Sequence, residues 1–294
     1  MTKTIAFQGT FGANSDMACR AVYPQAKTLP CISFDDAFLA VQEGRADTAM
    51  IPVENSVAGR VADVHRLLPK GGLHIVGEHY QPIEHHLLVI KGAKLEDIKT
   101  VESHVQALAQ CHTWLRDHKI RPIVHPDTAA AAEQMVKRGD KSVGAIASTL
   151  AAELYGLDSV ATNIADAPNN TTRFLILARE LKRASPDDDT ITTLIFRVRS
   201  VPAALYKALG GFATNGVNIT KLESYLVDGS FTAAQFYVDV EAHPESRAMR
   251  LAMEELAFFA QEVTILGVYP AHPFRRLRPD GTNPANPPLL GSRK

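Results

Sequence analysis

The stretch Asp127–Ala147 reads DTAAAAEQMVKRGDKSVGAIA, and an earlier stretch, Ser33–Val53, reads SFDDAFLAVQEGRADTAMIPV. Each starts with a residue that can cap a helix, continues with apolar residues at helical spacing, and reaches a glycine that can end the helix. Each then closes on a short apolar run that is typical of a buried strand. When Gly44 is aligned with Gly139, several apolar positions coincide. We therefore predict an α/β fold with two similar lobes that face each other.

Small polar residues follow the predicted strand in both stretches. They are Glu54-Asn55-Ser56 in the first and Ser148-Thr149 in the second. Helix N-termini offer free N–H groups and a positive dipole end, and ligands of open α/β sheets lie beyond the carboxyl ends of the strands. We predict that two helix starts line an anion-binding cleft. The alternative is that these residues only cap helices.

A second informative run is Asn170-Thr171-Thr172-Arg173-Phe174, which precedes the apolar residues 175–177. It places a hydroxyl, a cation and an aromatic ring side by side. Arg173 can bind a carboxylate with two hydrogen bonds, Thr172 can donate a hydrogen bond, and Phe174 can exclude water. The alternative is the entrance of a strand with a surface arginine.

The bulk composition limits the class of protein. At 294 residues the chain exceeds the usual size of one core, so we expect two or three domains. A net charge of -1 favours neither nucleic acid nor an anionic membrane as partner. The three cysteines are odd in number and widely spaced, which indicates a reducing compartment. The start shows no signal peptide, and no apolar run reaches the ~20 residues of a membrane span. We expect a cytoplasmic protein.

The chain changes character after Arg179. Residues 180–189 form a charged linker, and the pattern beyond it predicts a ferredoxin-like α+β sandwich of βαββαβ order. The expected elements are Thr190–Arg199, Ala203–Asn215, Asn218–Leu226, Phe231–Val240, Pro244–Phe259 and Val263–Tyr269, with Asp228-Gly229 as a hairpin turn. Such a module suits regulation or dimerisation. From Ala271 onward Pro, Gly, Asn and Arg dominate, so we expect a disordered tail that Arg275, Arg276 and Arg278 keep solvated.

These residues together resemble one family closely, the monofunctional prephenate dehydratases, whose catalytic domain is followed by an ACT regulatory domain. The resemblance covers nearly the whole chain except the tail. It rests on residues 7–9 (FQG), 12–15 (GANS), 51–59 (IPVENSVAG), 103–111 (SHVQALAQC), 144–148 (GAIAS), 151–157 (AAELYGL) and 170–174 (NTTRF). It implies a catalytic domain at 1–180, an ACT domain at 190–269 and a disordered tail at 270–294. Lobe one would be about 1–76 plus 163–180, and lobe two about 77–162.

The resemblance also implies an activity and a site. The family converts prephenate to phenylpyruvate with loss of water and carbon dioxide, in two lobes like those of periplasmic binding proteins with the active site in the cleft. Its essential threonine falls on Thr172. The residues expected to bind substrate are Arg173, Phe174, Asn55, Ser56, Ser15, Ala147 and Ser148. No cofactor or metal is implied, and the expected assembly is a homodimer or homotetramer.

The chemistry fits this set of residues. Losing carbon dioxide and hydroxide makes an aromatic ring, so the enzyme has only to orient prephenate and stabilise the departing oxygen. An alcohol is a reluctant acid, and we expect Thr172 to act as a firmly held hydrogen-bond donor. Glu54, beside a dianionic substrate, is expected to orient neighbouring groups.

Other candidates are weaker. His85 and His86 follow Glu84, but adjacent histidines on a strand point to opposite faces, which disfavours a shared zinc. His104 and the pair Cys111-His112 suggest a Cys/His nucleophile, yet nothing beside them supplies an oxyanion hole. We expect Ser103 to cap a helix instead.

In the second domain the resemblance implies binding of phenylalanine where two ACT domains pair. The residues concerned are Ala203, Ala204, Leu205, Asn218, Leu222, Glu223 and Ser224. Two departures from the family weaken this expectation. Its Gly-Ala-Leu turn reads Ala203-Ala204-Leu205, which costs backbone freedom, and its Glu-Ser-Arg-Pro motif reads Glu223-Ser224-Tyr225-Leu226. The alternative is an ACT domain that serves only dimerisation.

Three other functions remain open at this point. Arogenate dehydratase differs by an amine in place of the keto group of the substrate. A catalytically silent amino-acid sensor would keep the fold, but the Thr172-Arg173 pair argues against it. An extracytoplasmic solute-binding protein fits less well because the start resembles no export signal.

Overall fold

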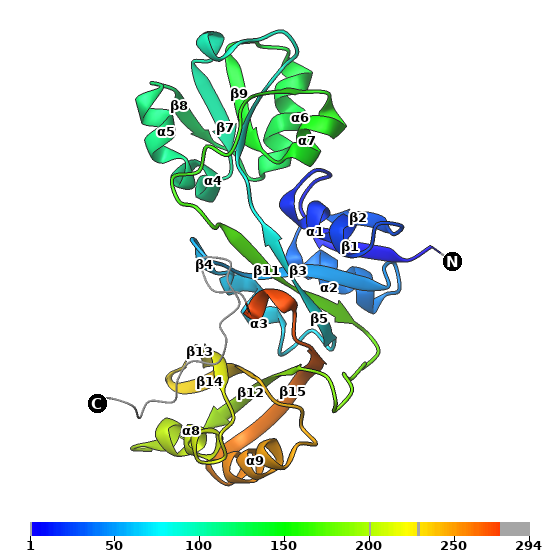
Figure 1. Cartoon of the computed structure of the whole chain (residues 1–294), viewed down its shortest axis with the longest axis vertical. Helices are drawn as coiled ribbons and strands as arrows, with labels where there is room; N and C mark the ends of the chain where they lie inside the picture. Colours follow the sequence, from blue (N-terminus) through cyan, green and yellow to red (C-terminus); the bar gives the residue numbers. More distant parts are fainter. Residues whose placement is uncertain (1, 200, 228–229, 277–294) are drawn as a thin grey trace, which may run out of the picture.

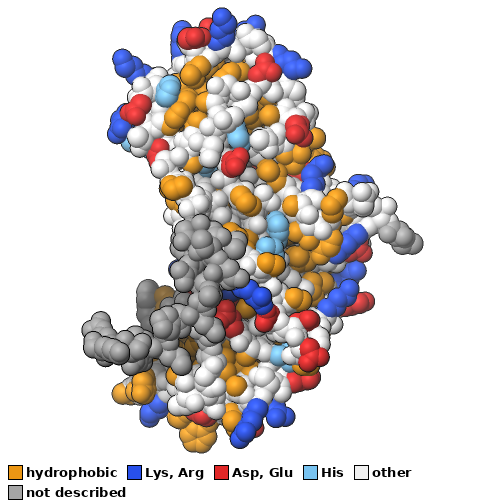
Figure 2. All heavy atoms as spheres, viewed as in Figure 1, with side chains coloured by type: hydrophobic (Ala, Val, Ile, Leu, Met, Phe, Trp, Pro, Cys, Tyr) orange, Lys and Arg blue, Asp and Glu red, His pale blue; other side chains and the backbone are white. Residues whose placement is uncertain are grey.

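The computed structural model describes residues 2–199, 201–227 and 230–276, and Figure 1 shows three layers stacked along the long axis. Two layers are α/β lobes, as the repeated stretches predict, and the third is a smaller α+β unit. On the face in Figure 2, Lys and Arg are interspersed with Asp and Glu. In the described ranges, no helix combines the length and the apolar character needed to span a membrane.

Lobe one occupies the middle layer and contains the N-terminal strands. Its strands are β1 (Thr4–Gln8), β2 (Lys27–Cys31), β3 (Thr48–Asn55), β4 (Gly59–Arg60), β5 (His74–Pro82) and β11 (Thr171–Ala178). Its helices are α1 (Asn14–Val22), α2 (Phe34–Gln42) and α3 (Ala62–Leu67). Strand β11 lies between β3 and β5 and is antiparallel to both. The catalytic motif predicted at residues 170–174 therefore enters the centre of this sheet.

Lobe two is built on a separate five-stranded sheet. Its strands are β6 (His86–Val89), β7 (Thr100–Ser103), β8 (Arg121–Val124), β9 (Val143–Ala147) and β10 (Asp158–Ala161). Its helices are the 3₁₀ turn η1 (Leu95–Asp97), α4 (Val105–Gln110), α5 (His112–Asp117), α6 (Thr128–Arg138) and α7 (Thr149–Tyr155). The chain enters this lobe after Pro82, not at residue 77 as predicted, because β5 belongs entirely to the sheet of lobe one.

The repeated stretches form the predicted elements. Ser33 caps α2 by accepting a hydrogen bond from the N–H of Asp36, and Asp127 caps α6 in the same way. Gly139 ends α6 with φ +69°, a left-handed conformation that glycine adopts without strain. Each helix is followed by a buried strand, β3 in lobe one and β9 in lobe two.

The third layer has the predicted βαββαβ order. Its elements are β12 (Thr190–Val198), α8 (Ala204–Thr214), β13 (Ile219–Val227), β14 (Ser230–Val240), α9 (Arg247–Phe259) and β15 (Ala260–Pro270). The antiparallel order β13-β14-β12-β15 is that of a ferredoxin-like sheet, and α8 and α9 pack on one of its faces. The predicted turn Asp228-Gly229 lies outside the described residues.

The other face of this sheet packs against lobe one, and the two sheets are also joined at an edge. A single parallel pair, Gly267 with Ile75, joins β15 to β5, so that both layers form one ten-stranded sheet. A Cβ atom on Gly267 would lie 2.2 Å from the carbonyl oxygen of Ile75, so only glycine permits this approach. Around the joint, Tyr237 and Tyr269 belong to the same hydrophobic cluster as the core of lobe one. The two layers are therefore packed as one body.

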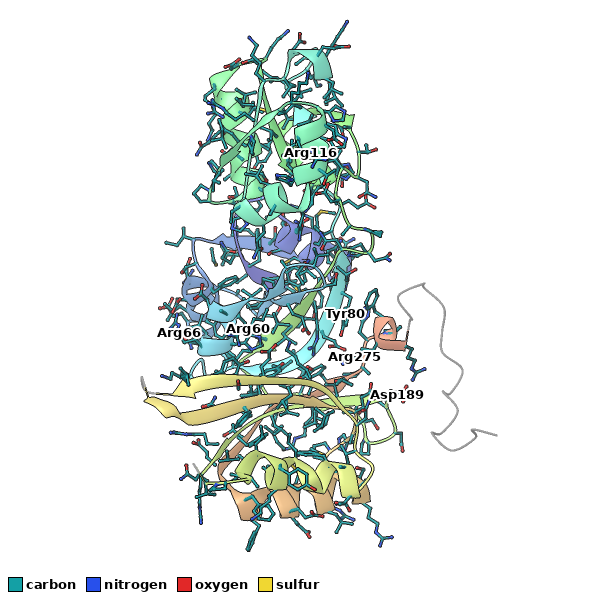
Figure 3. The ribbon with its side chains drawn as sticks, turned by 90° about the vertical axis from the view of Figure 1, so that its left-hand side faces the viewer. Arg60, Arg66, Tyr80, Arg116, Asp189 and Arg275 are labelled. Atoms are coloured by element: carbon teal, nitrogen blue, oxygen red, sulfur yellow. The ribbon has the colours of Figure 1, made fainter. Side chains whose placement is uncertain are left out.

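The segment after β15 is ordered as far as Arg276, which corrects the prediction of a disordered tail from residue 270. A short 3₁₀ helix, η2 (Pro273–Arg276), lies against β5. Arg275 donates to both carboxylate oxygens of Glu78, at 2.6 and 2.9 Å, and Phe274 stacks on Tyr80 (Figure 3). Arg275 is thus an anchor and not a solubilising charge. Residues 277–294, with Arg278, lie outside the described part.

The joint yields a prediction on stability. Gly267→Ala is expected to destabilise the protein by about 1–3 kcal/mol, because the new methyl group forces β15 away from β5. Gly210→Ala is the matched control: the added Cβ meets no atom within 4 Å in the interior of α8, and the change is expected to stabilise by about 0.5–1 kcal/mol. Urea unfolding of both variants measures this. Equal effects of the two substitutions would contradict the role given to Gly267.

Candidate active site

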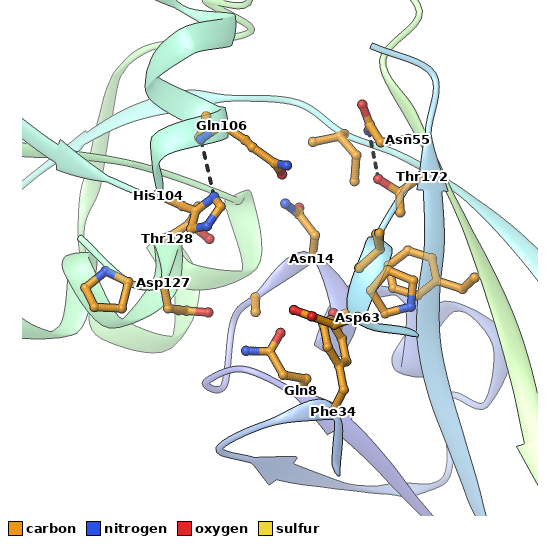
Figure 4. A pocket seen from close by; sticks show the side chains of 18 of the residues that line it. Gln8, Asn14, Phe34, Asn55, Asp63, His104, Gln106, Asp127, Thr128 and Thr172 are labelled. Atoms are coloured by element: carbon orange, nitrogen blue, oxygen red, sulfur yellow. Dashed lines mark hydrogen bonds between the residues drawn. The ribbon is translucent and has the colours of Figure 1, made fainter. Parts of the chain in front are cut away.

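Thr172 faces a large cavity between the two lobes. The cavity has a volume of about 830 Å³. Figure 4 shows Asn55 and Thr172 on one side, His104, Asp127 and Thr128 on the other, and Asn14 and Gln106 between them. Ser15 and Phe174, both predicted to bind substrate, also line it. The structure therefore brings Thr172, Asn55, Ser15 and Phe174 to one space.

The hydroxyl of Thr172 is oriented by Asn55, its neighbour across the β3–β11 pair. The side-chain amide of Asn55 donates to Thr172 Oγ1 at 2.9 Å and to Asn170 Oδ1 at 2.7 Å. Asn55 is itself held, because its Oδ1 accepts from the N–H groups of Val57 and Ala58 at 2.9 and 2.8 Å. Since Thr172 Oγ1 accepts this bond, its own proton stays available for donation into the cavity.

The same network continues into lobe two through Gln110. Gln110 Oε1 accepts from Asn170 Nδ2 at 3.0 Å and pairs with His85 Nε2 at 2.6 Å. Burial lowers the pKa of His85, which keeps the ring neutral at neutral pH. Because the partner oxygen is an acceptor, Nε2 carries the proton and the tautomer is defined. Residues of both lobes thus support Thr172, and neither Gln110 nor Asn170 is among the site residues predicted from the sequence.

The predicted pair of helix starts is wrong for lobe one. Strand β3 continues through Asn55 and turns back into β4, and the next helix begins only at Ala62. The cavity is lined instead by the first residues of other helices: Asn14 of α1, Phe34 of α2 and Thr128 of α6. Each helix start directs a positive dipole end toward an anion. An anion-binding cleft is therefore still consistent with the fold, with different residues.

Three predicted substrate-binding residues are used elsewhere. Ser56 donates to the carbonyl oxygen of Asn169 at 3.0 Å and accepts from the N–H of Thr171 at 3.0 Å. Ser148 caps α7, as predicted, but its hydroxyl donates to the carbonyl oxygen of Gly12 at 2.5 Å. It borders a separate cavity of about 170 Å³, and Ala147 is buried in β9. The described lining of the large cavity includes none of the three.

The largest correction concerns Arg173. Neighbouring residues of a strand point to opposite faces, so Arg173 points away from the cavity that Thr172 faces. Arg173 is 3% exposed, and its guanidinium reaches Glu54 at 2.9 Å, Glu78 at 2.8 Å and Asp239 of β14 at 2.6 Å. The Tyr269 hydroxyl completes the set at 3.0 Å. Arg173 therefore joins lobe one to the ferredoxin-like unit and does not face substrate.

The opposite charges in this cluster stabilise one another. Burial alone would raise the pKa of Asp239, but Arg173 and the Thr193 hydroxyl outweigh it and hold that pKa below its usual value. The pKa of Glu54 is also lowered, because Arg173 and Lys221 more than offset burial. Burial opposes the charge on Arg173, yet Asp239 raises its pKa well above the ordinary value. Glu54 contacts Arg173 and Lys221 in this cluster, and the lowered pKa values of Glu54 and Asp239 favour their charged forms.

The structure also shows the surroundings of the other candidate residues that the sequence offered. His85, just before β6, lines the large cavity, and His86, the first residue of β6, lines the small one, so the two side chains point in different directions, as predicted. Burial raises the pKa of Cys111 to about 12, so its thiol is not an activated nucleophile. Ser103 does not cap a helix, because its hydroxyl donates to the carbonyl oxygen of Ile146 at 2.6 Å and His104 is the cap of α4.

The residues predicted to bind phenylalanine lie around the edge of the ferredoxin-like unit. Ala203 precedes α8 with φ +62°, a conformation in which an alanine is strained where glycine is not. Leu222 and Ser224 of β13 are exposed. Asn218 donates to Glu241 at 2.6 Å. Glu223 differs from the expectation, because it pairs with Arg60 and Lys221 on the side of lobe one.

The fold and the cavity define a two-lobed α/β enzyme with a polar site between its lobes. The family model for prephenate dehydratase matches residues 5–182. The chain is 51% identical to a bifunctional N-acyl-homoserine lactone acylase/prephenate dehydratase of Komagataeibacter europaeus, over 93% of this chain and 98% of that one. It is 42% identical to arogenate dehydratase/prephenate dehydratase 1 of Arabidopsis thaliana, over 90% of this chain and 71% of that one.

Among solved structures, the prephenate dehydratase of Arthrobacter aurescens in complex with L-Phe has a TM-score of 0.85 and 29% identity. The match covers 97% of this chain and 93% of that one. The chain belongs to the prephenate dehydratase family. It is a lyase that converts prephenate to phenylpyruvate with loss of water and carbon dioxide.

Because Arg173 lies at the interface between lobe one and the ferredoxin-like unit, we predict that its substitution lowers the stability of the protein and does not act through substrate binding. Arg173→Met removes the cation that Glu54, Glu78 and Asp239 share and leaves Lys221 and Arg275 beside them. We expect it to lower the unfolding free energy by about 3–5 kcal/mol. Arg45→Met is the control: this exposed arginine pairs with Asp36 and Glu43, and its loss is expected to cost less than about 1 kcal/mol. Unfolding in urea measures both. Unchanged stability of Arg173→Met with a much raised KM would restore Arg173 to substrate binding.

Proposed function

We propose that Thr172 donates a hydrogen bond to the hydroxyl group that leaves prephenate. The observation that carries the proposal is the Asn55 amide, which donates to Thr172 Oγ1 at 2.9 Å. As carbon dioxide and hydroxide depart, negative charge grows on the leaving oxygen, and a donor already in place stabilises it without reorganisation. The electrons of the broken carbon–carbon bond complete the aromatic ring, and the leaving hydroxide becomes water on gaining a proton.

The two carboxylates of prephenate need positive partners other than Arg173. Arg60 and Arg66 line the cavity, as do the first residues of α1, α2 and α6. We propose that these groups bind the carboxylates, with Ser15 as a further donor, while Asn55 directs its amide N–H groups to Thr172 and Asn170. Phe174, which is 1% exposed, supplies an apolar wall for the ring. In this proposal these groups take the role of Arg173, which the sequence predicted to bind a substrate carboxylate.

We propose further that the ferredoxin-like unit is an ACT domain and that L-phenylalanine binds there as a feedback inhibitor. The βαββαβ order and the Phe-bound relative support this. Leu222, Ser224, Asn218 and residues 203–205 are the proposed contacts, and Glu223 joins them only by leaving Arg60 and Lys221. A homodimer or homotetramer in the cytoplasm is part of the same proposal.

A second candidate activity is hydrolysis of N-acyl-homoserine lactones, in which water adds across the amide. It is proposed because the relative from Komagataeibacter europaeus has this activity in its name. The chain also offers an apolar cavity of about 380 Å³, lined by Val57, Ala109, Ala165 and Ala167. This cavity shares Gln106 and Gln110 with the main one and suits an acyl chain beside a polar head group.

The role of Thr172 is tested by paired substitutions. Thr172→Val keeps the shape but removes the donor, and kcat/KM for prephenate is expected to fall by about 10²- to 10⁴-fold. Thr172→Ser keeps the hydroxyl and is expected to retain most of the activity. Phenylpyruvate formation is followed by absorbance, and phenylalanine binding by calorimetry is expected to survive both changes. Normal turnover by Thr172→Val would refute the assigned role.

Substrate and effector are tested on the wild-type protein. Prephenate is expected to be turned over faster than arogenate, and L-phenylalanine is expected to lower the rate. Faster turnover of arogenate would reverse the substrate preference, and a rate unaffected by phenylalanine would leave the ACT domain a dimerisation role.

The second candidate activity is tested in a parallel assay. An N-acyl-homoserine lactone is added to the wild-type protein, and release of homoserine lactone is measured by mass spectrometry. Absence of release would remove the second activity.

A further inference from the structure

Strand β13 is the edge strand of the ferredoxin-like sheet, and its two faces have different surroundings. Leu222, Ser224 and Leu226 are exposed, and Lys221 and Tyr225 alternate with them on the partly buried face. This is the period-two pattern of a strand with one covered side. The covered side meets lobe one, and Figure 3 shows Arg60 and Arg66 in the layer directly next to this sheet.

Three residues of that face contact one continuous segment of lobe one, residues 54–65. Lys221 pairs with Glu54 at 2.5 Å, Glu223 with Arg60 at 3.3 Å, and the Tyr225 hydroxyl with His65 Nδ1 at 2.6 Å. The same region of the chain supplies one wall of the active-site cavity. The wall residues are Asn55, Arg60, Val61, Ala62, Asp63 and Arg66. The segment thus lies between the cavity and β13.

The contact between Tyr225 and His65 is the most enclosed of the three. The two rings stack with centroids 5.3 Å apart and planes at 30°. Tyr237 of β14 packs edge-on against the same histidine at 5.1 Å and 88°. His65 is 2% exposed and lies on α3 between Asp63 and Arg66, which both line the cavity. Helix α3 is short and has two buried side chains, Val64 in the core of lobe one and His65 against the neighbouring sheet, so the contact of His65 helps to decide where its cavity face lies.

We propose that Tyr225 is a positioning residue of the dehydratase: through His65 it holds α3, and with it Asp63 and Arg66, in the wall of the active-site cavity. Tyr225 stands where the resembled family has the arginine of its Glu-Ser-Arg-Pro motif. The departure places a tyrosine ring and hydroxyl against His65. The inference rests on the proposed use of this cavity for the substrate. If α3 shifts, only a fraction of the protein molecules have a cavity wall that can bind substrate. The apparent affinity for substrate is then reduced in proportion to that fraction.

Four full-length variants test the proposal. Tyr225→Phe keeps the stacked ring and removes the hydroxyl. His65→Leu removes its partner, His65→Asn restores an acceptor close to Nδ1, and the fourth variant combines Tyr225→Phe with His65→Leu. Tyr206→Phe on α8, where the tyrosine is 80% exposed, is the control. The melting temperature, kcat and KM for prephenate are measured for each.

We expect the Tyr225 and His65 variants to change KM for prephenate and to leave kcat nearly unchanged. Tyr225→Phe is expected to raise KM about two- to tenfold, the factor that corresponds to one lost hydrogen bond, with kcat within about twofold of wild type. The double variant is expected to match its worse single parent, because both remove one interaction. His65→Asn is expected to recover part of the loss, and Tyr206→Phe to behave as wild type.

Other outcomes overturn the inference. A lowered melting temperature with unchanged KM would make the Tyr225–His65 contact an ordinary packing contact. Additive effects in the double variant would show that the two residues act separately. Should Tyr225→Phe fail to fold, the comparison of His65→Asn with His65→Leu decides, and equal KM values for these two refute the proposal. A wild-type protein inactive on prephenate would refute the proposed function instead, which separates the two failures.

Discussion

The buried guanidinium of Arg173 is the interaction on which the arrangement of the layers depends. It carries one charge into a space shared by Glu54, Glu78 and Asp239, and these carboxylates come from β3, β5 and β14. Taking so many charges out of water is costly, and only their close mutual contact offsets the cost. Lys221 and Arg275 pair with Glu54 and Glu78, but Arg173 is the cation that all three carboxylates share, so it holds the lobe and the ferredoxin-like unit in one relative position.

This constraint bears directly on the active site because strands alternate. Thr172 and Arg173 are neighbours, and Asn55 and Glu54 are neighbours on the strand beside them. The residues of one face, Thr172 and Asn55, form a hydrogen bond at the cavity, while those of the other face form an ion pair at the domain interface. Two adjacent residues therefore connect the proposed donor to the ferredoxin-like layer without any long pathway.

The cavity is polar more than it is charged. Amide side chains dominate near Thr172: Asn55, Asn170 and Gln110 form a continuous hydrogen-bonded chain that ends at the neutral His85. Such a chain has little freedom to rearrange, because each oxygen already accepts from a defined donor. That property suits a reaction driven by aromatisation, in which a rigid donor stabilises the leaving oxygen and no strong acid is required.

Local chemistry in the sequence determined much of this molecule. The capped helices that start at Ser33 and Asp127, the buried strands after them and the βαββαβ order all follow from patterns within about 20 residues, which backbone geometry translates directly. The motif at residues 170–174 also located Thr172 and Phe174 at the cavity. The expectation that adjacent side chains point in opposite directions separated His85 from His86, and the same rule, applied along β11, would have separated Arg173 from Thr172.

Only the tertiary structure decided which partner each side chain meets. Asn55 and Asn170 are 115 residues apart, and Arg275 and Glu78 are 197 apart, so no local pattern announces these pairs. The extension of β3 through Asn55 depends on its pairing with β11 and β4, which overrides the tendency of small polar residues to begin a helix. Arg173 is an interface residue for the same reason: three carboxylates from strands far apart in the sequence surround it, and their close contacts offset the cost of its burial.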